Sequence, residues 1–254
     1  MTAPKSHVKV SGIWKEAKKI YVKVSGTWKD VNKAYVRQSG VWKQTFTRTQ
    51  FSYQTSAYSD PAAAAITFSS LSFGAADPTR KILIGVTCRD NSSSDVVSVS
   101  IGGVGATEVL KVRNVSGGYL SIAAFYIADV PNGTTGDVYI DWSATPFYHG
   151  CHVWSLYGLE TNTPTSTATD TNGGSPMAVN LTTQTGDWLF GVAYSQSSTA
   201  DNITWSGLTK HSQPHGTTCG ASYTATSSES PRAISASCAS TSSYNAAASC
   251  SFRP

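Results

Sequence analysis

From Ile66 to Phe252 the chain is a succession of short strand-like runs, and turn signals separate one run from the next. Runs such as "KILIGVTC", "GDVYIDW" and "DWLFGVAYS" are rich in β-branched and aromatic residues, which favour strands. Segments such as "VPNGTTGD" and "TNGGSP" supply turn residues, and nothing has convincing helical periodicity over a dozen residues. This pattern predicts an all-β fold, with a β-sandwich or jelly roll over residues 65–254.

The order of apolar residues distinguishes two kinds of strand. In "GDVYIDW" apolar and polar residues alternate, so we expect Val138, Ile140 and Trp142 in the core and Tyr139 outside. In contrast, "KILIGV" and "DWLFGV" are apolar at successive positions, which is typical of a strand that is covered on both faces. We therefore expect these two runs to be central strands.

The first fifty residues contain one phrase three times at a spacing of fourteen residues, as "VKVSGIWK", "VKVSGTWK" and "VRQSGVWK". Each copy has a β-rich arm, a Ser-Gly pair suited to a turn, and a second arm led by tryptophan. The repeat predicts three β-hairpins in a row, a meander over residues 1–46. A unit of about forty-five residues rarely buries enough apolar surface to stand alone, so it needs a partner. Residues 47–64 lose the lysines, and we interpret them as a linker.

The length of the turn decides which residues face each other in each hairpin. With a two-residue Ser-Gly turn, each tryptophan lies opposite a cation. The pairs are then Lys9 with Trp14, Lys23 with Trp28, and Arg37 with Trp42. A three-residue loop with a bulge would change these partners, and the sequence leaves the register open.

Charge is distributed unevenly along the chain. Residues 1–50 hold eleven Lys or Arg and two acids, a net charge of +9, whereas residues 51–254 hold eight and thirteen, a net charge of −5. A basic segment on a mildly acidic body indicates docking onto an acidic surface. The alternative is an exposed sheet edge on which lysines prevent aggregation. Binding of a nucleic acid is disfavoured, because the basic region is short and the remaining 204 residues are net acidic.

The compartment is indicated by the first residues and by the cysteines. "MTAPKSHVKV" lacks the apolar segment of a secretory leader, and no run approaches the roughly 18 apolar residues of a membrane span. We therefore expect synthesis in a cytoplasm, no membrane insertion, and buried free thiols. Cys238 and Cys250 lie in two short runs that could be neighbouring strands, so a disulfide between them stays open.

Metal and catalytic motifs are weak in this sequence. "HGCH" and "HSQPHGTTC" have suitable ligands, but Cys151 and His152 are adjacent and would point to opposite faces of a strand, so we expect no metal site. Asp137 and Asp141 would lie about 13 Å apart along a strand, beyond the spacing of about 5–9.5 Å for glycoside hydrolysis. We expect no catalytic residues and no cofactor.

The repeat and the later strands together resemble one family. The pattern "YVKVSGTWKxVxKxYV" resembles the short N-terminal repeats of virion proteins of tailed bacteriophages. The stretch from "VVSVSIGGVGATEV" through "YLSIAAFYIADVPNGTTGDVYIDW" to "ITWSGLTK" looks like a β-sandwich module of phage fibre or appendage proteins. The resemblance implies a structural virion component on the exterior of the particle, attached through its N-terminal repeat to a tail, baseplate, neck or capsid protein.

The resulting hypothesis is a non-enzymatic short tail fibre or receptor-binding adhesin, assembled as a homo-oligomer such as a trimer. Two alternatives are kept, a capsid decoration or head or neck fibre protein, and a glycan-degrading enzyme on a β-sandwich. The expected docking contacts are the three cation–tryptophan pairs named above. The expected contacts with a host surface glycan or protein are Tyr139, Tyr148 and Trp205.

Overall fold

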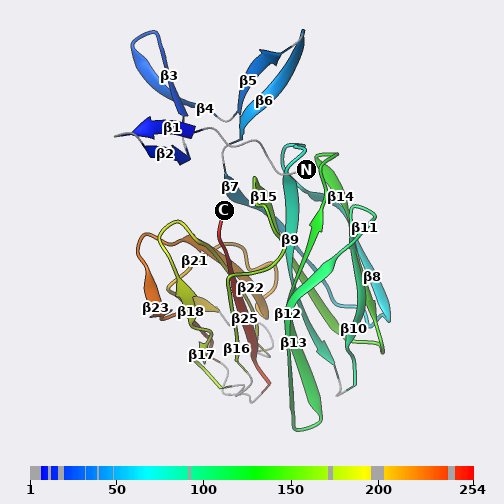
Figure 1. The fold of residues 1–254 in the computed structure, drawn as a ribbon. Helices are drawn as coiled ribbons and strands as arrows, with labels where there is room; N and C mark the ends of the chain where they lie inside the picture. Colours follow the sequence, from blue (N-terminus) through cyan, green and yellow to red (C-terminus); the bar gives the residue numbers. More distant parts are fainter. Residues whose placement is uncertain are drawn as a thin grey trace.

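A computed structural model describes most of the chain (Figure 1). The described residues are 7–10, 13–16, 20–31, 33–38, 40–47, 49–90, 93–170, 174–195, 203–239 and 244–254. All regular structure in these ranges is β-strand, and every strand pair is antiparallel. The expectation of an all-β fold is therefore confirmed.

The first unit of the body is a sandwich of two sheets. Its inner sheet contains, in spatial order, β12 (Thr107–Ser116), β13 (Tyr119–Asp129), β9 (Arg80–Asp90), β15 (Tyr148–Tyr157) and β7 (Gln50–Ser59). Its outer sheet contains β11 (Val104–Gly105), β10 (Val96–Ile101), β14 (Thr135–Trp142) and β8 (Ala65–Ser72). The pairs are nested along the chain, because β7 pairs with β15, β8 with β14, β9 with β13 and β10 with β11. Nested pairing of this kind is the pattern of a rolled-up hairpin, as in a jelly roll.

The second unit repeats this arrangement. Its inner sheet contains β16 (Ser166–Asp170), β25 (Ala246–Phe252), β19 (Trp188–Tyr194), β22 (Thr218–Thr224) and β21 (Thr209–Lys210). Two small outer sheets contain β17 (Met177–Ala178) with β24 (Ser235–Ser237) and β20 (Thr204–Ser206), and β18 (Leu181–Thr183) with β23 (Glu229–Arg232). The order β16-β25-β19-β22-β21 matches the order β7-β15-β9-β13-β12 strand for strand. The body therefore contains the same topology twice.

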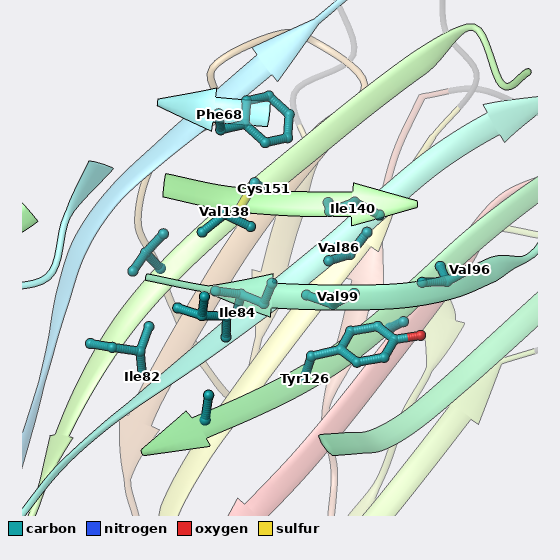
Figure 2. Packing of buried hydrophobic residues seen from close by; sticks show 14 of the residues in the cluster. Phe68, Ile82, Ile84, Val86, Val96, Val99, Tyr126, Val138, Ile140 and Cys151 are labelled. Atoms are coloured by element: carbon teal, nitrogen blue, oxygen red, sulfur yellow. The ribbon is translucent and has the colours of Figure 1, made fainter. Parts of the chain in front are cut away.

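Three apolar layers hold the four layers of sheet together. The first lies inside the first unit, and Figure 2 shows Phe68, Val99 and Ile140 of the outer sheet packing toward Ile84 and Val86 of β9. The third lies inside the second unit. The middle layer joins the two inner sheets and includes Leu83, Phe125 and Trp154 of the first unit with Phe190 and Phe252 of the second.

Two expectations about the body need correction. The single sandwich expected over residues 65–254 is two sandwich units stacked through their inner sheets. The linker expected at residues 47–64 contains β7, which pairs along its length with β15. The loss of lysines suggested a loop, but it reflects burial, because Phe51 and Tyr53 pack against the middle apolar layer.

The patterns of individual strands are confirmed. Val138, Ile140 and Trp142 are buried, and Tyr139 between them is exposed. The runs "KILIGV" and "DWLFGV" fall in β9 and β19, which are the central strands of the two inner sheets and are buried on both faces. All five cysteines are free thiols, so Cys238 and Cys250 do not form a disulfide.

The repeat forms three separate hairpins, drawn in blue beyond the end of β7 in Figure 1. They are β1 (His7–Val10) with β2 (Ile13–Glu16), β3 (Ile20–Val24) with β4 (Thr27–Val31), and β5 (Lys33–Gln38) with β6 (Val41–Thr47). Each hairpin is its own two-stranded sheet in the described residues, so the expected meander is not formed.

Candidate functional site

The middle hairpin has the two-residue turn that places tryptophan opposite lysine. Ser25 and Gly26 both have positive φ, +50° and +83°, as a two-residue type I′ turn requires. Consequently Lys23 pairs with Trp28, and the Lys23 Nζ lies 5.8 Å from the centroid of the indole ring. This contact contributes about 0.5–1 kcal/mol at an exposed site. The register that the sequence left open is thus the two-residue register.

The other two hairpins have the same backbone register. Lys9 is paired with Trp14, and Arg37 with Trp42. The side chains of Lys9, Trp14 and Trp42 lie outside the described part of the structure. Arg37 is exposed, and its Nε donates to the Gly40 carbonyl at 3.5 Å.

The middle hairpin exposes both of its faces. Every residue from 21 to 28 is exposed, and Trp28 is 65% and Tyr21 52% accessible. Val22 and Val24, on the opposite face from Trp28, are also exposed. An isolated two-stranded hairpin is at best marginally stable in water. The hairpin therefore presents apolar and basic side chains that the described body does not cover.

The three aromatic residues expected to contact a glycan do not form one surface. Tyr139 is 38% exposed on the outer face of β14, beside Thr67 and Ser100. Tyr148 lies on the inner sheet of the same unit and is half-buried. Trp205 belongs to the second unit, so the three rings lie on separate sheets.

Trp205 is half-buried, and its contact with a glycan stays a prediction. Its ring packs against the core of the second unit, and its Cη2 would lie 2.6 Å from a Cβ on Gly191. The alternation of β20 explains this position, because Ile203 is buried and Trp205 lies on the same face two residues later. Part of the Trp205 ring therefore contributes to the packing of the second unit.

Tyr148 belongs to a row of side chains that crosses one end of the inner sheet. The rings of Tyr58 and Tyr148 stack with centroids 6.3 Å apart. The Arg89 guanidinium lies 5.7 Å from the Tyr148 centroid and 4.8 Å from the Tyr119 centroid. These four residues lie on β7, β15, β9 and β13, which are adjacent strands, and we call them the Tyr–Arg row. All four are half-buried.

The second unit contacts both ends of the Tyr–Arg row. His215 stacks on Tyr58 with centroids 4.2 Å apart and an interplanar angle of 2°. Tyr244 meets the edge of Tyr119 at 5.1 Å. Tyr194 of β19 is buried beneath this end of the interface, within electrostatic reach of Arg89 and Tyr148. The row therefore lies where the two units meet, at the ends of their central strands.

Three buried polar atoms at the Tyr–Arg row lack a hydrogen-bond partner in the described residues. They are the Nε of Arg89 and the hydroxyls of Tyr58 and Tyr194. Leaving such a donor unpaired costs about 1–3 kcal/mol, and more for a charged group. Burial raises the pKa of Tyr194, and the nearby Arg89 cation opposes this shift. Burial followed by the neighbouring Asp60 carboxylate raises the pKa of Tyr58.

The middle of the interface is polar and tightly packed. The hydroxyls of Thr87 and Thr218 are 2.8 Å apart, and His152 Nε2 lies 3.0 Å from the Thr218 hydroxyl. Burial, reinforced by the neighbouring His211, lowers the pKa of His152 to about 3, so the imidazole is neutral at neutral pH. Gly150 and Gly220 lie at the points of closest approach. These groups orient one sheet on the other.

The candidate metal ligands are dispersed by the fold. Cys151 packs in the apolar layer of the first unit, whereas His152 faces the second unit, as their adjacency on a strand predicts. His211 instead stacks on Tyr53 with centroids 4.5 Å apart. In the ranges that the structure describes, no three His, Cys, Asp or Glu residues are grouped as a metal site would need.

Of the two candidate carboxylates, Asp137 lines a hollow of about 320 Å³ beside Asn132 and Phe73. Asp137 accepts a hydrogen bond from the Ser70 backbone at 2.8 Å, where it closes an irregularity in β8. A hollow of about 450 Å³ opens between β7 and β8 and includes Tyr58, Pro61 and Phe68 in its lining. This lining contains no charged residue.

The Tyr–Arg row was missed by sequence reasoning. Arg89, Tyr58 and Tyr119 come from strands far apart in the chain, and their register alone brings them together. The available signal was that each is a polar or aromatic residue at a strand end.

Comparison with known proteins gives no further assignment. No protein-family model, curated protein or solved structure matches the chain. The described ranges contain no helix that is long and apolar enough to cross a bilayer.

Proposed function

We propose that this chain is a non-enzymatic structural protein of a tailed bacteriophage particle, a short tail fibre or receptor-binding adhesin that docks through its N-terminal hairpins. One observation carries the proposal. The middle hairpin exposes Trp28, Tyr21, Val22 and Val24 on two faces, although burying a large apolar side chain contributes about 1.5–3 kcal/mol. An exposed hairpin of this composition is suited to a docking surface on another protein.

The charge of the hairpins supports the same role. The net charge of +9 over residues 1–50 and the pairing of tryptophan with lysine favour an acidic, partly apolar partner surface. Fourteen-residue repeats supply three similar contact units on one chain. Several weak contacts on one chain bind more tightly together than each does alone.

The body suits a role in display. Two sandwich units share a continuous apolar middle layer, so they form a stiff support at the end of the hairpins. Their exposed loops and strand ends supply the surface that faces outward in this proposal.

Deletion of residues 1–46 tests the docking role. The body begins at β7 (Gln50–Ser59), so the truncated chain is expected to keep its cooperative unfolding and its β circular dichroism. It is also expected to be absent from purified particles when it is produced in the host in place of the full chain. Trp28→Ala weakens incorporation, whereas Tyr139→Ala on the outer face of β14 leaves it unchanged. Incorporation of the truncated chain at the normal level would contradict the proposal.

Three further measurements separate the alternatives. Electron microscopy of intact particles distinguishes a tail fibre from a capsid decoration or a neck fibre. Sedimentation of the purified chain as a monomer at micromolar concentration would contradict a trimeric fibre. Turnover of a host polysaccharide that one acidic substitution abolishes would replace the adhesin by a glycan-degrading enzyme.

A further inference from the structure

We propose that the Tyr–Arg row binds an acidic saccharide, with Arg89 holding the carboxylate and the adjacent tyrosine rings packing on the sugar. This inference rests on the proposed display function and deepens it, because it names the class of glycan and the surface that recognises it. The surface differs from the outer face that carries Tyr139.

Arg89 differs from every other cation of the body in its surroundings. The other seven Lys and Arg residues from 51 to 254 each have a hydrogen-bond acceptor or an acid in the described residues. Arg80, for example, donates to five backbone carbonyls. Arg89 has aromatic rings at its two sides, and within the described ranges its Nε has no acceptor. Among the described residues no carboxylate forms an ion pair with this guanidinium, whereas such a group usually binds an anion.

The geometry prepares Arg89 for a carboxylate. Tyr119 and Tyr148 hold the guanidinium between them, which reduces the conformational freedom lost on binding. A guanidinium presents parallel N–H groups that match the two oxygens of a carboxylate. The residue is half-buried at the end of β9, so part of it reaches solvent.

The rings around Arg89 indicate a sugar rather than a simple anion. A pyranose ring presents C–H groups on its face and hydroxyls on its edge. The C–H groups are attracted to the negative face of an aromatic ring, and the hydroxyls can exchange hydrogen bonds with polar groups at the edge of the row. A polyanion is disfavoured, because the row has one cation and Asp60 lies beside Tyr58. One carboxylate on a sugar fits this balance of charge.

The interface between the two units does not require a cation flanked by tyrosine rings for its packing. An apolar side chain between Tyr119 and Tyr148 would fill the same space without burying an unpaired charged donor. We therefore expect Arg89→Gln to fold with a thermal midpoint equal to or above that of the wild type. Binding of an anion explains why an Arg occupies this position.

The test is a titration of the purified full chain, monitored by NMR or calorimetry, with D-glucuronic acid, N-acetylneuraminic acid, D-glucose and acetate as probes. We expect at least one of the acidic sugars to bind at least tenfold more tightly than glucose and acetate. Arg89→Gln is expected to weaken that binding at least tenfold, Arg89→Lys less, and Tyr148→Ala severalfold. Val97→Ala, at an exposed position of β10 in the outer sheet, serves as the control and is expected to leave the affinity unchanged.

Several outcomes would overturn the inference. One is that neither acidic sugar binds at concentrations up to about 20 mM, a range that covers weak affinities for single sugars. The others are that acetate or glucose binds equally well, or that Arg89→Gln leaves the affinity unchanged. If Arg89→Gln does not fold, Tyr148→Ala and Arg89→Lys decide the result by the same criterion. The assay needs no particle, so a chain that docks but binds no acidic sugar contradicts this inference alone. A chain that binds the sugar but does not join particles contradicts the docking proposal alone.

Discussion

Replacing Gly150 by alanine probes the contact between the two inner sheets. Gly150 lies in β15, and a Cβ at this position would overlap the Thr87 hydroxyl and lie 2.6 Å from the Thr218 hydroxyl. These two hydroxyls are themselves hydrogen-bonded across the interface at 2.8 Å. The methyl group therefore has no space unless the threonines separate or the sheets move apart.

The expected loss of stability follows from two contributions. Overpacking a well-packed interior costs about 1–3 kcal/mol. Breaking the Thr87–Thr218 hydrogen bond costs about 0.5–1.5 kcal/mol more. We expect Gly150→Ala to lower the free energy of unfolding by about 2–4 kcal/mol. Urea unfolding followed by tryptophan fluorescence measures this change, because Trp154 lies in the same interface.

Two controls make the reasoning refutable. Gly105→Ala in the exposed β11 has open space around its added Cβ and an ordinary φ, so its effect should stay within about 0.5 kcal/mol. In a Thr87→Ala background the overlapping hydroxyl is absent, and Gly150→Ala should cost less than in the wild type. An equal cost in both backgrounds, or a neutral Gly150→Ala, would show that the close approach of the sheets is not what requires glycine.

Three further predictions concern the interior. Arg80→Lys should lower the free energy of unfolding in urea by about 2–4 kcal/mol, since lysine cannot reach the five carbonyls that Arg80 bonds; a neutral result would contradict this clamp. The folded state holds His152 neutral with a pKa of about 3, whereas in the unfolded chain His152 binds a proton near pH 6.5. The free energy of unfolding therefore falls as the pH drops from about 6 to 3, by up to about 1.4 kcal/mol per pH unit. His152→Asn should reduce this slope by about one proton, and an unchanged slope would assign the proton elsewhere. A thiol reagent should modify Cys238 in the native chain and all five cysteines after unfolding, because the other four are buried; rapid native reaction of more than one thiol would contradict this burial.

Much of the local structure follows from sequence periodicity. The strict alternation of "GDVYIDW" fixed Trp142 inside and Tyr139 outside, because successive side chains on a strand point to opposite faces. The continuous apolar runs around Ile84 and Phe190 identified the two central strands, because a strand covered on both faces has no polar side. The Ser-Gly turn limited the hairpins to two registers.

Errors arose where polarity and burial diverge. β7 carries polar residues such as Gln54 and Ser56 beside Phe51, and it was interpreted as a linker although it closes the inner sheet. A strand at the edge of a sheet can carry polar side chains and still be part of the fold, since its backbone hydrogen bonds do not depend on its side chains.

The sequence by itself determined the class of fold, the hairpin repeat, the opposite charges of the two parts and the identity of the central strands. These are local properties, encoded by periods of two and fourteen residues and by the positions of lysine and glycine. The tertiary structure decided that the body is one topology used twice, and that Tyr58, Arg89, Tyr119 and Tyr148 form one row. Both depend on pairing between strands distant in the chain. That pairing is stabilised by the hydrogen bonds of a particular register and by the packing of whole sheets, which no local pattern encodes.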